Sequence, residues 1–237
     1  MKKKIFITGA SSEIGVAVIK KFNQNNWFIT AHLNKNTKIK RIFKNYKDIS
    51  FLKHDFSKNL SSEKFIKKNK KLLRQFNAYI NLTGLNKPKS FHKINTSDLY
   101  KHINTNYLSG LFISREIVLS AMKKKWGRVL LTSSIGTKFG GGENTFAYSI
   151  SKFLNEFLPR NFRNLAKHNV LFNCLRIGVT DTKIHKNIPN KNMKKRIKLI
   201  PTNKIAKPEE IAEYIYFLCS EKNSQITNKV LDISGGE

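Results

Sequence analysis

A tyrosine and a lysine at helical spacing carry the clearest chemistry in the sequence. Tyr148 and Lys152 are four residues apart in a segment that we predict to be helical, so the phenol and the ammonium lie on one helix face. A phenol has an ordinary pKa near 10, and an adjacent ammonium stabilises its ionised form. One such charge about 4 Å away is worth roughly 4 kcal/mol at an effective dielectric of 20, before desolvation offsets it. The pair can therefore exchange a proton with a carbonyl or alcohol oxygen.

Hydroxyl groups at the end of a predicted strand can support this pair. Ser133 and Ser134 follow Thr132 at the end of the strand predicted over 127–133. A hydroxyl placed there can hydrogen-bond a substrate oxygen and hold it against the phenol. We favour Ser134 as this residue and keep Ser133 as the alternative.

A glycine-rich turn joins the first predicted strand to the first predicted helix. Gly9 and Gly15 permit a tight turn and a close approach of backbone to phosphate, and the helix N-terminus presents unpaired N–H groups. Ser11 and Ser12 can donate to phosphate oxygens. Glu13 is unfavourable beside a pyrophosphate unless its side chain points to solvent. The turn therefore predicts a dinucleotide site.

The end of the second predicted strand indicates which dinucleotide binds. An acidic residue there would hold the ribose 2′-hydroxyl of NAD, but residues 32–36 contain none. Lys35, next to Asn34, can meet a 2′-phosphate, or it is one more surface lysine. The sequence favours NADP(H) over NAD(H).

Strand-length apolar runs alternate with helix-length amphipathic segments along the chain. Strands are expected at 4–8, 27–32, 49–53, 78–82, 127–133, 170–177 and 229–233, and helices at 14–25, 62–74, 97–124, 145–167 and 208–220. This alternation predicts a Rossmann-type doubly wound parallel sheet of about seven strands with helices on both faces, in a single domain over 1–237. Ligands of such sheets lie beyond the carboxyl ends of the strands.

Taken together, these motifs resemble the short-chain dehydrogenase/reductase family over essentially the entire chain. The likeness rests on the turn at 8–15, on Asn81-Leu82-Thr83-Gly84, on the Tyr148 and Lys152 pair, and on 206–212 and 234–236 near the end. It implies Asn106, Ser134, Tyr148 and Lys152 as catalytic residues. In this scheme Asn106 closes a proton relay to Lys152 through water, and Asn104 is the competing choice.

The same resemblance implies the residues that bind the nucleotide. They are Gly9, Ser11, Ser12, Glu13, Ile14, Gly15, Asn34, Lys35, Asp55, Phe56, Asn81, Thr83, Gly84, Tyr148, Lys152, Gly178 and Thr182. Asp55 resembles the residue that contacts adenine in the family, and Thr182 is a candidate for the nicotinamide carboxamide.

Four features depart from the family pattern. Glu13 replaces the middle glycine of the turn, and Ile177 stands where proline is usual before Gly178. Ser134 precedes Tyr148 by 14 residues, one more than is common, which keeps Ser133 open. Pro159 lies inside the predicted helix over 145–167 and should kink it.

The charge of the chain is strongly basic. Lys and Arg number 45 against 15 Asp and Glu, a net charge of +30, which suits nucleic acid, an anionic membrane or an acidic partner. The lysine clusters carry no recognition motif, so we expect a compositional origin and no specific nucleic-acid partner. The basic segment 182–204 has no assigned role and is a candidate lid.

Other side chains limit the remaining classes of function. Cys174 and Cys219 lie in apolar stretches as expected free thiols, which fits a reducing cytoplasm. The six histidines lack metal-ligand spacing, so we expect no metal site. No apolar stretch approaches the roughly 18 residues of a membrane span, and we expect no membrane association.

The leading hypothesis is an NADPH-dependent carbonyl reductase or alcohol dehydrogenase that resembles the 3-oxoacyl-[acyl-carrier-protein] reductases. Its substrate would be a small-molecule or acyl-thioester carbonyl, the latter on an acidic carrier protein that suits the basic surface. The alternatives are a dehydrogenase of a sugar or other small polar alcohol or ketone, and a non-catalytic NADP(H)-sensing member. The family likeness also implies a homodimer or homotetramer.

Overall fold

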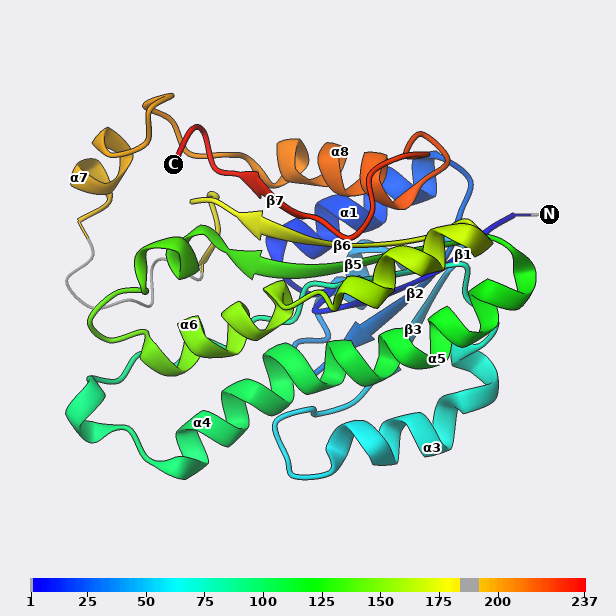
Figure 1. The fold of residues 1–237 in the computed structure, drawn as a ribbon, viewed down its shortest axis with the longest axis horizontal. Helices are drawn as coiled ribbons and strands as arrows, with labels where there is room; N and C mark the ends of the chain where they lie inside the picture. The colour runs from blue at the N-terminus through cyan, green and yellow to red at the C-terminus, as the bar shows by residue number, and fades with distance from the viewer. Residues whose placement is uncertain (1, 184–191) are drawn as a thin grey trace.

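Seven parallel strands form one central sheet in the computed structural model, which describes residues 2–183 and 192–237 (Figure 1). The strands are β1 (Lys4–Thr8), β2 (Phe28–Leu33), β3 (Ile49–Lys53), β4 (Ala78–Asn81), β5 (Gly127–Ser134), β6 (Val170–Ile177) and β7 (Val230–Ile233). Their order is β3-β2-β1-β4-β5-β6-β7, and every neighbouring pair is parallel. All seven carboxyl ends therefore meet at one edge, and the predicted fold class is confirmed.

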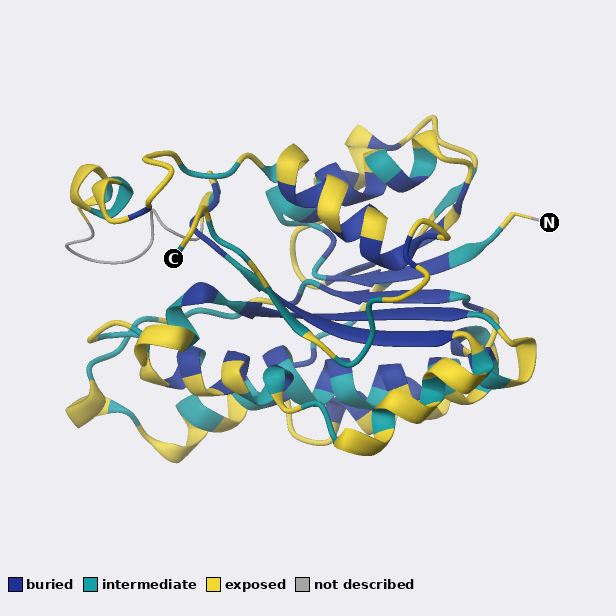
Figure 2. Cartoon of the chain, turned by 45° about the horizontal axis from the view of Figure 1, so that its top comes forward, coloured by how far each residue is buried: buried dark blue, intermediate teal, exposed yellow. Residues whose placement is uncertain are grey.

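Helices cover both faces of the sheet, as Figure 1 shows. They are α1 (Glu13–Gln24), α2 (Ile39–Ile42), α3 (Ser61–Leu73), α4 (Thr96–Ile103), α5 (Ser109–Lys124), α6 (Phe146–Phe153), α7 (Met193–Lys198) and α8 (Pro208–Cys219). One apolar core packs α1 and α8 against the sheet, and a second packs α3 and α5 against the other face. The five inner strands are mostly buried, the edge strands β3 and β7 are partly exposed, and the helices are exposed on their outer sides (Figure 2). Because strands buried on both faces need apolar residues throughout, runs such as 5–7 identify them.

Side chains at the helix ends set several helix boundaries. The Ser12 hydroxyl accepts a hydrogen bond from Gly15 N at the start of α1, and Asn95 with Asp98 forms a reciprocal capping box at the start of α4. Pro208 occupies the first turn of α8, as its sequence predicts. These local signals define where α1, α4 and α8 begin in the chain.

The two longest predicted helices differ from the prediction. The expected helix over 97–124 contains a π-helical turn at Asn104–Leu108 between α4 and α5. The helix expected over 145–167 is wrong beyond 153: α6 is followed by one 3₁₀ turn at Leu154–Glu156 and another 3₁₀ segment at Arg160–His168. Pro159, which has no N–H to donate, lies in the extended link between them. The expected kink is therefore a complete break.

The short helices α2 and α7 were not expected from the sequence. Each spans only a turn or so, below the length at which periodicity is informative. The helix α7 belongs to the basic segment 182–204. Residues 184–191 of that segment lie outside the described residues, so the candidate lid is not tested by the structure.

Candidate active site

A pocket of about 370 Å³ opens at the carboxyl edge of the sheet. It lies where the strand order reverses between β1 and β4, the position at which open α/β sheets bind ligands. The predicted residues that line it are Gly9, Ser11, Ser12, Glu13, Ile14, Asn34, Phe56, Thr83, Gly84, Ser134, Tyr148, Lys152, Gly178 and Thr182. Residues far apart in the sequence are thus brought to one cavity.

The turn between β1 and α1 forms a close-fitting cradle at one end of the pocket. Gly9 has φ +70°, and a Cβ atom there would lie 2.3 Å from the carbonyl oxygen of Leu82. A Cβ atom on Gly15 would lie 2.5 Å from the carbonyl oxygen of Ala10. The Ser12 hydroxyl accepts from Gly15 N and donates to the Gly9 carbonyl, both at 3.0 Å. Both glycines therefore let the turn pack tightly on neighbouring backbone, and the start of α1 that follows fits a phosphate at a helix N-terminus.

Glu13 does not point away from this cradle. Its side chain is half-buried and lines the pocket, and Oε1 accepts a long hydrogen bond of 3.4 Å from Lys183 N. The carboxylate thus connects the nucleotide turn with the chain beyond β6. A negative charge stands where a phosphate would approach, which is unfavourable for binding an anion.

Lys152 is buried deep in the pocket wall, with 3% of its surface exposed. Nζ donates to the carbonyl oxygens of Thr83 at 2.8 Å and of Thr132 at 3.0 Å, and lies 3.3 Å from Thr132 Oγ1. These oxygens come from just beyond β4 and from β5, so two strand ends fix the ammonium. Burial lowers the pKa of the Lys152 ammonium to about 8.

Tyr148 lies one helical turn before Lys152 and is partly buried. Burial raises the pKa of its phenol, and an interaction with the Ser134 hydroxyl offsets part of that rise. Ser134 Oγ accepts a hydrogen bond of 3.3 Å from Gly136 N, which leaves the hydroxyl proton available to the pocket. The phenol therefore holds its proton at neutral pH, next to a second hydroxyl donor.

Ser133 faces a different group. Its hydroxyl donates to Glu156 Oε1 at 2.6 Å and is buried, although the residue also borders the pocket. Of the two serines left open by the sequence, Ser134 is the one that interacts with the Tyr148 phenol.

Asn106 lies behind the pocket, within the π-helical turn. Its side chain accepts from Leu85 N at 2.7 Å and donates to the Leu85 carbonyl and to Ser151 Oγ at 2.9 and 2.8 Å. It thereby ties the chain after β4 to the helix that carries Tyr148. Asn104 instead directs its amide toward the Lys58 carbonyl, 3.5 Å away.

Four more predicted residues lie outside the pocket lining. Gly15 is buried in the cradle, and Asn81 is fully buried, with Oδ1 accepting from the Thr8 hydroxyl at 2.8 Å. Lys35 is exposed beyond Asn34. Asp55 Oδ1 accepts from the backbone and hydroxyl of Ser57 at 3.0 and 2.7 Å. Asn81 and Gly15 therefore shape the site from behind.

Some residues that line the pocket were not predicted from the sequence. His32 borders the pocket from the end of β2, where its strand-end position was the available signal. Burial lowers the pKa of His32 to about 4, so its ring is neutral at pH 7. Thr105 and Thr180 also border the pocket and have no sequence motif of their own.

Metal clusters and membrane spans are both absent from the part of the chain that the structure describes. Within 2–183 and 192–237, no group of three or more His, Cys, Asp or Glu side chains is placed to hold a metal ion. None of the helices over the same residues has the length and apolar character needed to cross a membrane.

Comparisons with known proteins agree with the geometry. A family model described as enoyl-(acyl carrier protein) reductase matches residues 9–237. The chain is 26% identical over 240 residues to 3-oxoacyl-[acyl-carrier-protein] reductase FabG of Aquifex aeolicus, covering 99% of this chain and 96% of that protein. It is 24% identical over 243 residues to 3alpha-hydroxysteroid dehydrogenase of Mediterraneibacter gnavus, covering 99% and 97%. Among solved structures, ElxO with NADP bound superposes with a TM-score of 0.83 at 25% identity, covering 99% of this chain and 98% of ElxO.

Proposed function

The chain belongs to the short-chain dehydrogenase/reductase family of oxidoreductases, and from this premise we propose that it is an NADPH-dependent carbonyl reductase with Tyr148 as its general acid. The observation that carries the proposal is the convergence of Tyr148, Ser134 and buried Lys152 in the pocket at the switch point of the sheet. We propose that residues 1–237 act as one NAD(P)-binding domain.

Each side chain has a distinct task in this proposal. A reduced nicotinamide, when bound, supplies the hydride. Tyr148 donates its phenolic proton to the carbonyl oxygen, and Ser134 donates a hydrogen bond to the same oxygen. The Lys152 ammonium stabilises the phenolate that remains. Asn106 joins the chain after β4 to α6 and takes part in the relay that returns a proton through water. The raised pKa of Tyr148 suits a proton donor, which favours the reductive direction.

The cradle and the strand ends support the choice of nucleotide. Gly9, Ser11 and Ile14 would hold the pyrophosphate, and Thr182 the nicotinamide amide. Asn34 and Lys35 at the end of β2 leave room for a 2′-phosphate and bring no negative charge to it. ElxO, which has the same fold, was solved with NADP bound.

The substrate that we favour is a 3-oxoacyl thioester, after the FabG relative. A carrier protein that is acidic would be attracted by the net charge of +30. The hydroxysteroid relative shows that similar chains act on other alcohols, so small ketones and keto-sugars belong in the same assay as competing substrates.

The experiment follows NADPH consumption with an acetoacetyl thioester, simple ketones and keto-sugars. Tyr148→Phe should lower kcat by about 10³-fold, because it removes the proton donor, while the Kd for NADPH changes less than about threefold. Lys152→Ala should lower kcat and also weaken NADPH binding, because Lys152 lines the pocket that we propose for the nucleotide. NADPH binding without consumption of any substrate would instead identify a sensing protein.

The assembly and the compartment are also part of the proposal. We propose a homodimer or homotetramer, for which exposed apolar residues of α6 such as Phe153 offer a contact surface; light scattering after size exclusion measures this directly. Cys174 and Cys219 are free and buried, which suits a reducing cytoplasm.

A further inference from the structure

A buried carboxylate that no sequence motif marks lies beside the serine of the site. Glu156 ends the 3₁₀ turn after α6, and its side chain is 5% exposed. Glu156 follows Lys152 by four residues, about one helical turn further along the side of α6 that carries Tyr148 and Lys152. Its carboxylate reaches β5, where it accepts a hydrogen bond from the Ser133 hydroxyl.

The two carboxylate oxygens of Glu156 contact different partners. Oε2 accepts from the Arg176 guanidinium at 2.7 Å, and Arg176 also pairs with Asp232 at 3.1 Å. Oε1 accepts from the Ser133 hydroxyl at 2.6 Å, and the Thr137 hydroxyl lies 2.6 Å away from it. One oxygen therefore belongs to an ion pair, whereas the other binds two hydroxyls.

Those two hydroxyls lie on either side of Ser134. Ser133 precedes it, and the Thr137 hydroxyl also lies 2.6 Å from the Ser134 carbonyl oxygen. Between them, the 3₁₀ turn η3 (Ile135–Phe139) directs Gly136 N to Ser134 Oγ at 3.3 Å. Glu156 therefore contacts the hydroxyls of the residue before Ser134 and of a residue in the turn after it, and that same turn supplies the N–H that binds the Ser134 hydroxyl.

We infer that Glu156 is a positioning residue for Ser134: its Oε1 fixes the chain on both sides of that serine and so aims the serine hydroxyl at the phenol of Tyr148. The inference rests on the proposed function of Ser134 and Tyr148. If Glu156 only stabilised the fold, its ion pair with Arg176 through Oε2 would be sufficient. Substitutions that affect Oε1 and Oε2 differently can therefore distinguish a positioning role from a structural one.

Glu156→Gln keeps an oxygen for the two hydroxyls and loses the charge that pairs with Arg176. It should lower the melting temperature but leave kcat within about threefold of the unaltered protein. Glu156→Leu removes the acceptor and should lower kcat by about 10- to 100-fold, because small displacements of a positioning group have effects of this size. In both Glu156 variants, the KM for NADPH and the Kd for NADPH should change less than about twofold.

Two further variants keep the inference testable if Glu156→Leu does not fold. Thr137→Val keeps the volume, removes one hydroxyl and should lower kcat by about tenfold with the same unchanged Kd for NADPH. Asp232→Asn is the matched control, because it weakens the Arg176 pair and an exposed, long contact of 3.6 Å with Lys138, and it touches neither hydroxyl. Its kcat should equal that of the unaltered protein.

A measurement that needs no turnover separates this inference from the proposed function. The titration of the Tyr148 phenol, followed by NMR with labelled tyrosine and assigned from Tyr148→Phe, should move to higher pH in Glu156→Leu and stay unchanged in Asp232→Asn. If no substrate is reduced but the titration moves, the proposed reaction fails and the positioning role stands. Unaltered kcat and titration in Glu156→Leu, or an equal loss in Asp232→Asn, would overturn the inference.

Discussion

Lys152 is buried, and burial disfavours the charged form of its amine. Three oxygens accept from or lie beside Nζ, yet burial still lowers the pKa of this ammonium to about 8. The unfolded chain would keep the ordinary lysine pKa near 10.4. The buried charge therefore lowers the stability of the fold below pH 8, and that cost disappears as the pH rises from about 8 toward 10.4.

The same pKa predicts the pH dependence of catalysis. In the proposed reaction Lys152 acts in its protonated form, so kcat/KM for NADPH, which reports groups of the nucleotide-free enzyme, should fall tenfold per pH unit above about pH 8. A pH–rate profile at constant ionic strength measures this. Lys152→Arg stays charged throughout, and any residual activity should lack that descending limb. A profile of the unaltered enzyme that is flat to pH 10 would contradict the assignment.

Because of Glu13, we expect NADPH to bind more weakly than it would to the same turn without this carboxylate. Its carboxylate lines the pocket and accepts from Lys183 N, so an approaching pyrophosphate meets a negative charge and must displace it. Glu13→Gly should tighten NADPH binding by about tenfold, or about 1.4 kcal/mol. Isothermal calorimetry at low salt gives the Kd, and the gain should shrink at high salt.

Glu13→Gln is the matched variant, since it keeps the size and removes the charge. It should recover most of the gain in affinity if repulsion is the cause. Equal affinities of the glutamine variant and the unaltered chain would show that bulk, rather than charge, limits binding.

Local spacing was enough to predict the Tyr148 and Lys152 pair, because residues four apart on a helix share a face. The same spacing places Glu156 one turn beyond Lys152, but it does not show which groups the carboxylate contacts. Its place beside Ser133 depends on where α6 breaks and on how the broken end packs on β5 and β6. Contacts of this kind join segments about 20 residues apart, and no periodicity in the sequence encodes them.

At the scale of elements, the packing of α5 on β4 predicts a sensitive glycine. A Cβ atom on Gly110 would lie 2.2 Å from the Asn81 amide nitrogen. Asn81 Oδ1 accepts from the hydroxyls of Thr8 and Thr83 at 2.8 and 2.6 Å, so this one residue joins the ends of two strands. The helix can approach the sheet this closely only where it has no side chain.

Gly110→Ala should therefore destabilise the protein by about 1–3 kcal/mol, through overpacking against Asn81. Urea denaturation followed by circular dichroism measures the free energy of unfolding. Gly142→Ala is the control, because its Cβ atom would meet only Thr145 Oγ1 at 3.5 Å, an ordinary contact. Similar losses in both variants would mean that Asn81 is not the cause.

The sheet was easier to predict than the helices that cover it. Fully buried parallel strands need short apolar runs, and all seven were found within one or two residues of their observed bounds. The π-helical turn at Asn104–Leu108 gave no comparable signal, since its residues fit a regular helix equally well. Pro159 signalled a kink, but whether the helix bends or ends depends on how residues 160–168 pack on β6, where Phe162 stacks near Phe172.

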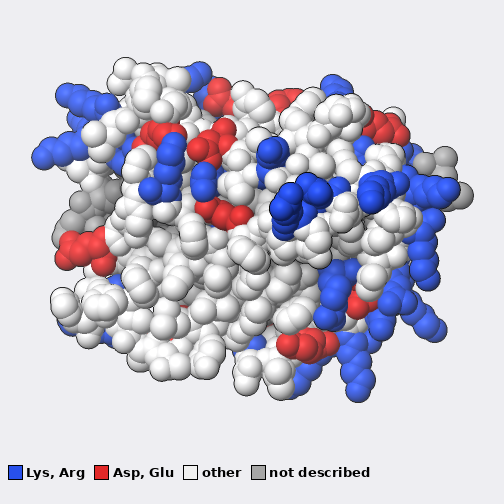
Figure 3. Space-filling view, in the orientation of Figure 1, with Lys and Arg blue, Asp and Glu red and all other residues white. Residues whose placement is uncertain are grey.

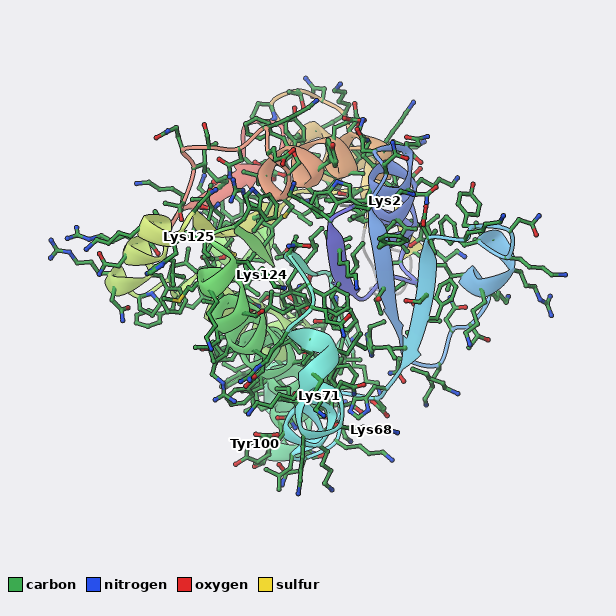
Figure 4. All side chains as sticks on the ribbon, turned by 90° about the vertical axis from the view of Figure 1, so that its right-hand side faces the viewer. Lys2, Lys68, Lys71, Tyr100, Lys124 and Lys125 are labelled. Atoms are coloured by element: carbon green, nitrogen blue, oxygen red, sulfur yellow. The ribbon has the colours of Figure 1, made fainter. Side chains whose placement is uncertain are left out.

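At the scale of the whole molecule, charge is distributed unevenly. Figure 3 shows a wide uncharged area over α4 and α6, with lysine and arginine gathered toward the amino ends of the strands. Figure 4 looks onto that end, where Lys68 and Lys71 of α3 lie on the lower side and Lys124 of α5 and Lys125 lie higher and to the left. Copies of a chain with a net charge of +30 repel each other least where such charges are absent. The uncharged area therefore supports the proposed homo-oligomer.

The net charge of +30 also predicts how salt affects the fold. Like charges repel within the folded chain, and raising the ionic strength from about 10 to 150 mM shortens the screening length from roughly 30 to 8 Å. The melting temperature should rise by about 2–4 °C, equivalent to about 1 kcal/mol. Lys68→Glu with Lys71→Glu, both exposed, should raise the melting temperature at low salt and reduce the response. A melting temperature that falls with salt would mean that attractive pairs, such as Lys21 with Glu213, outweigh the repulsion.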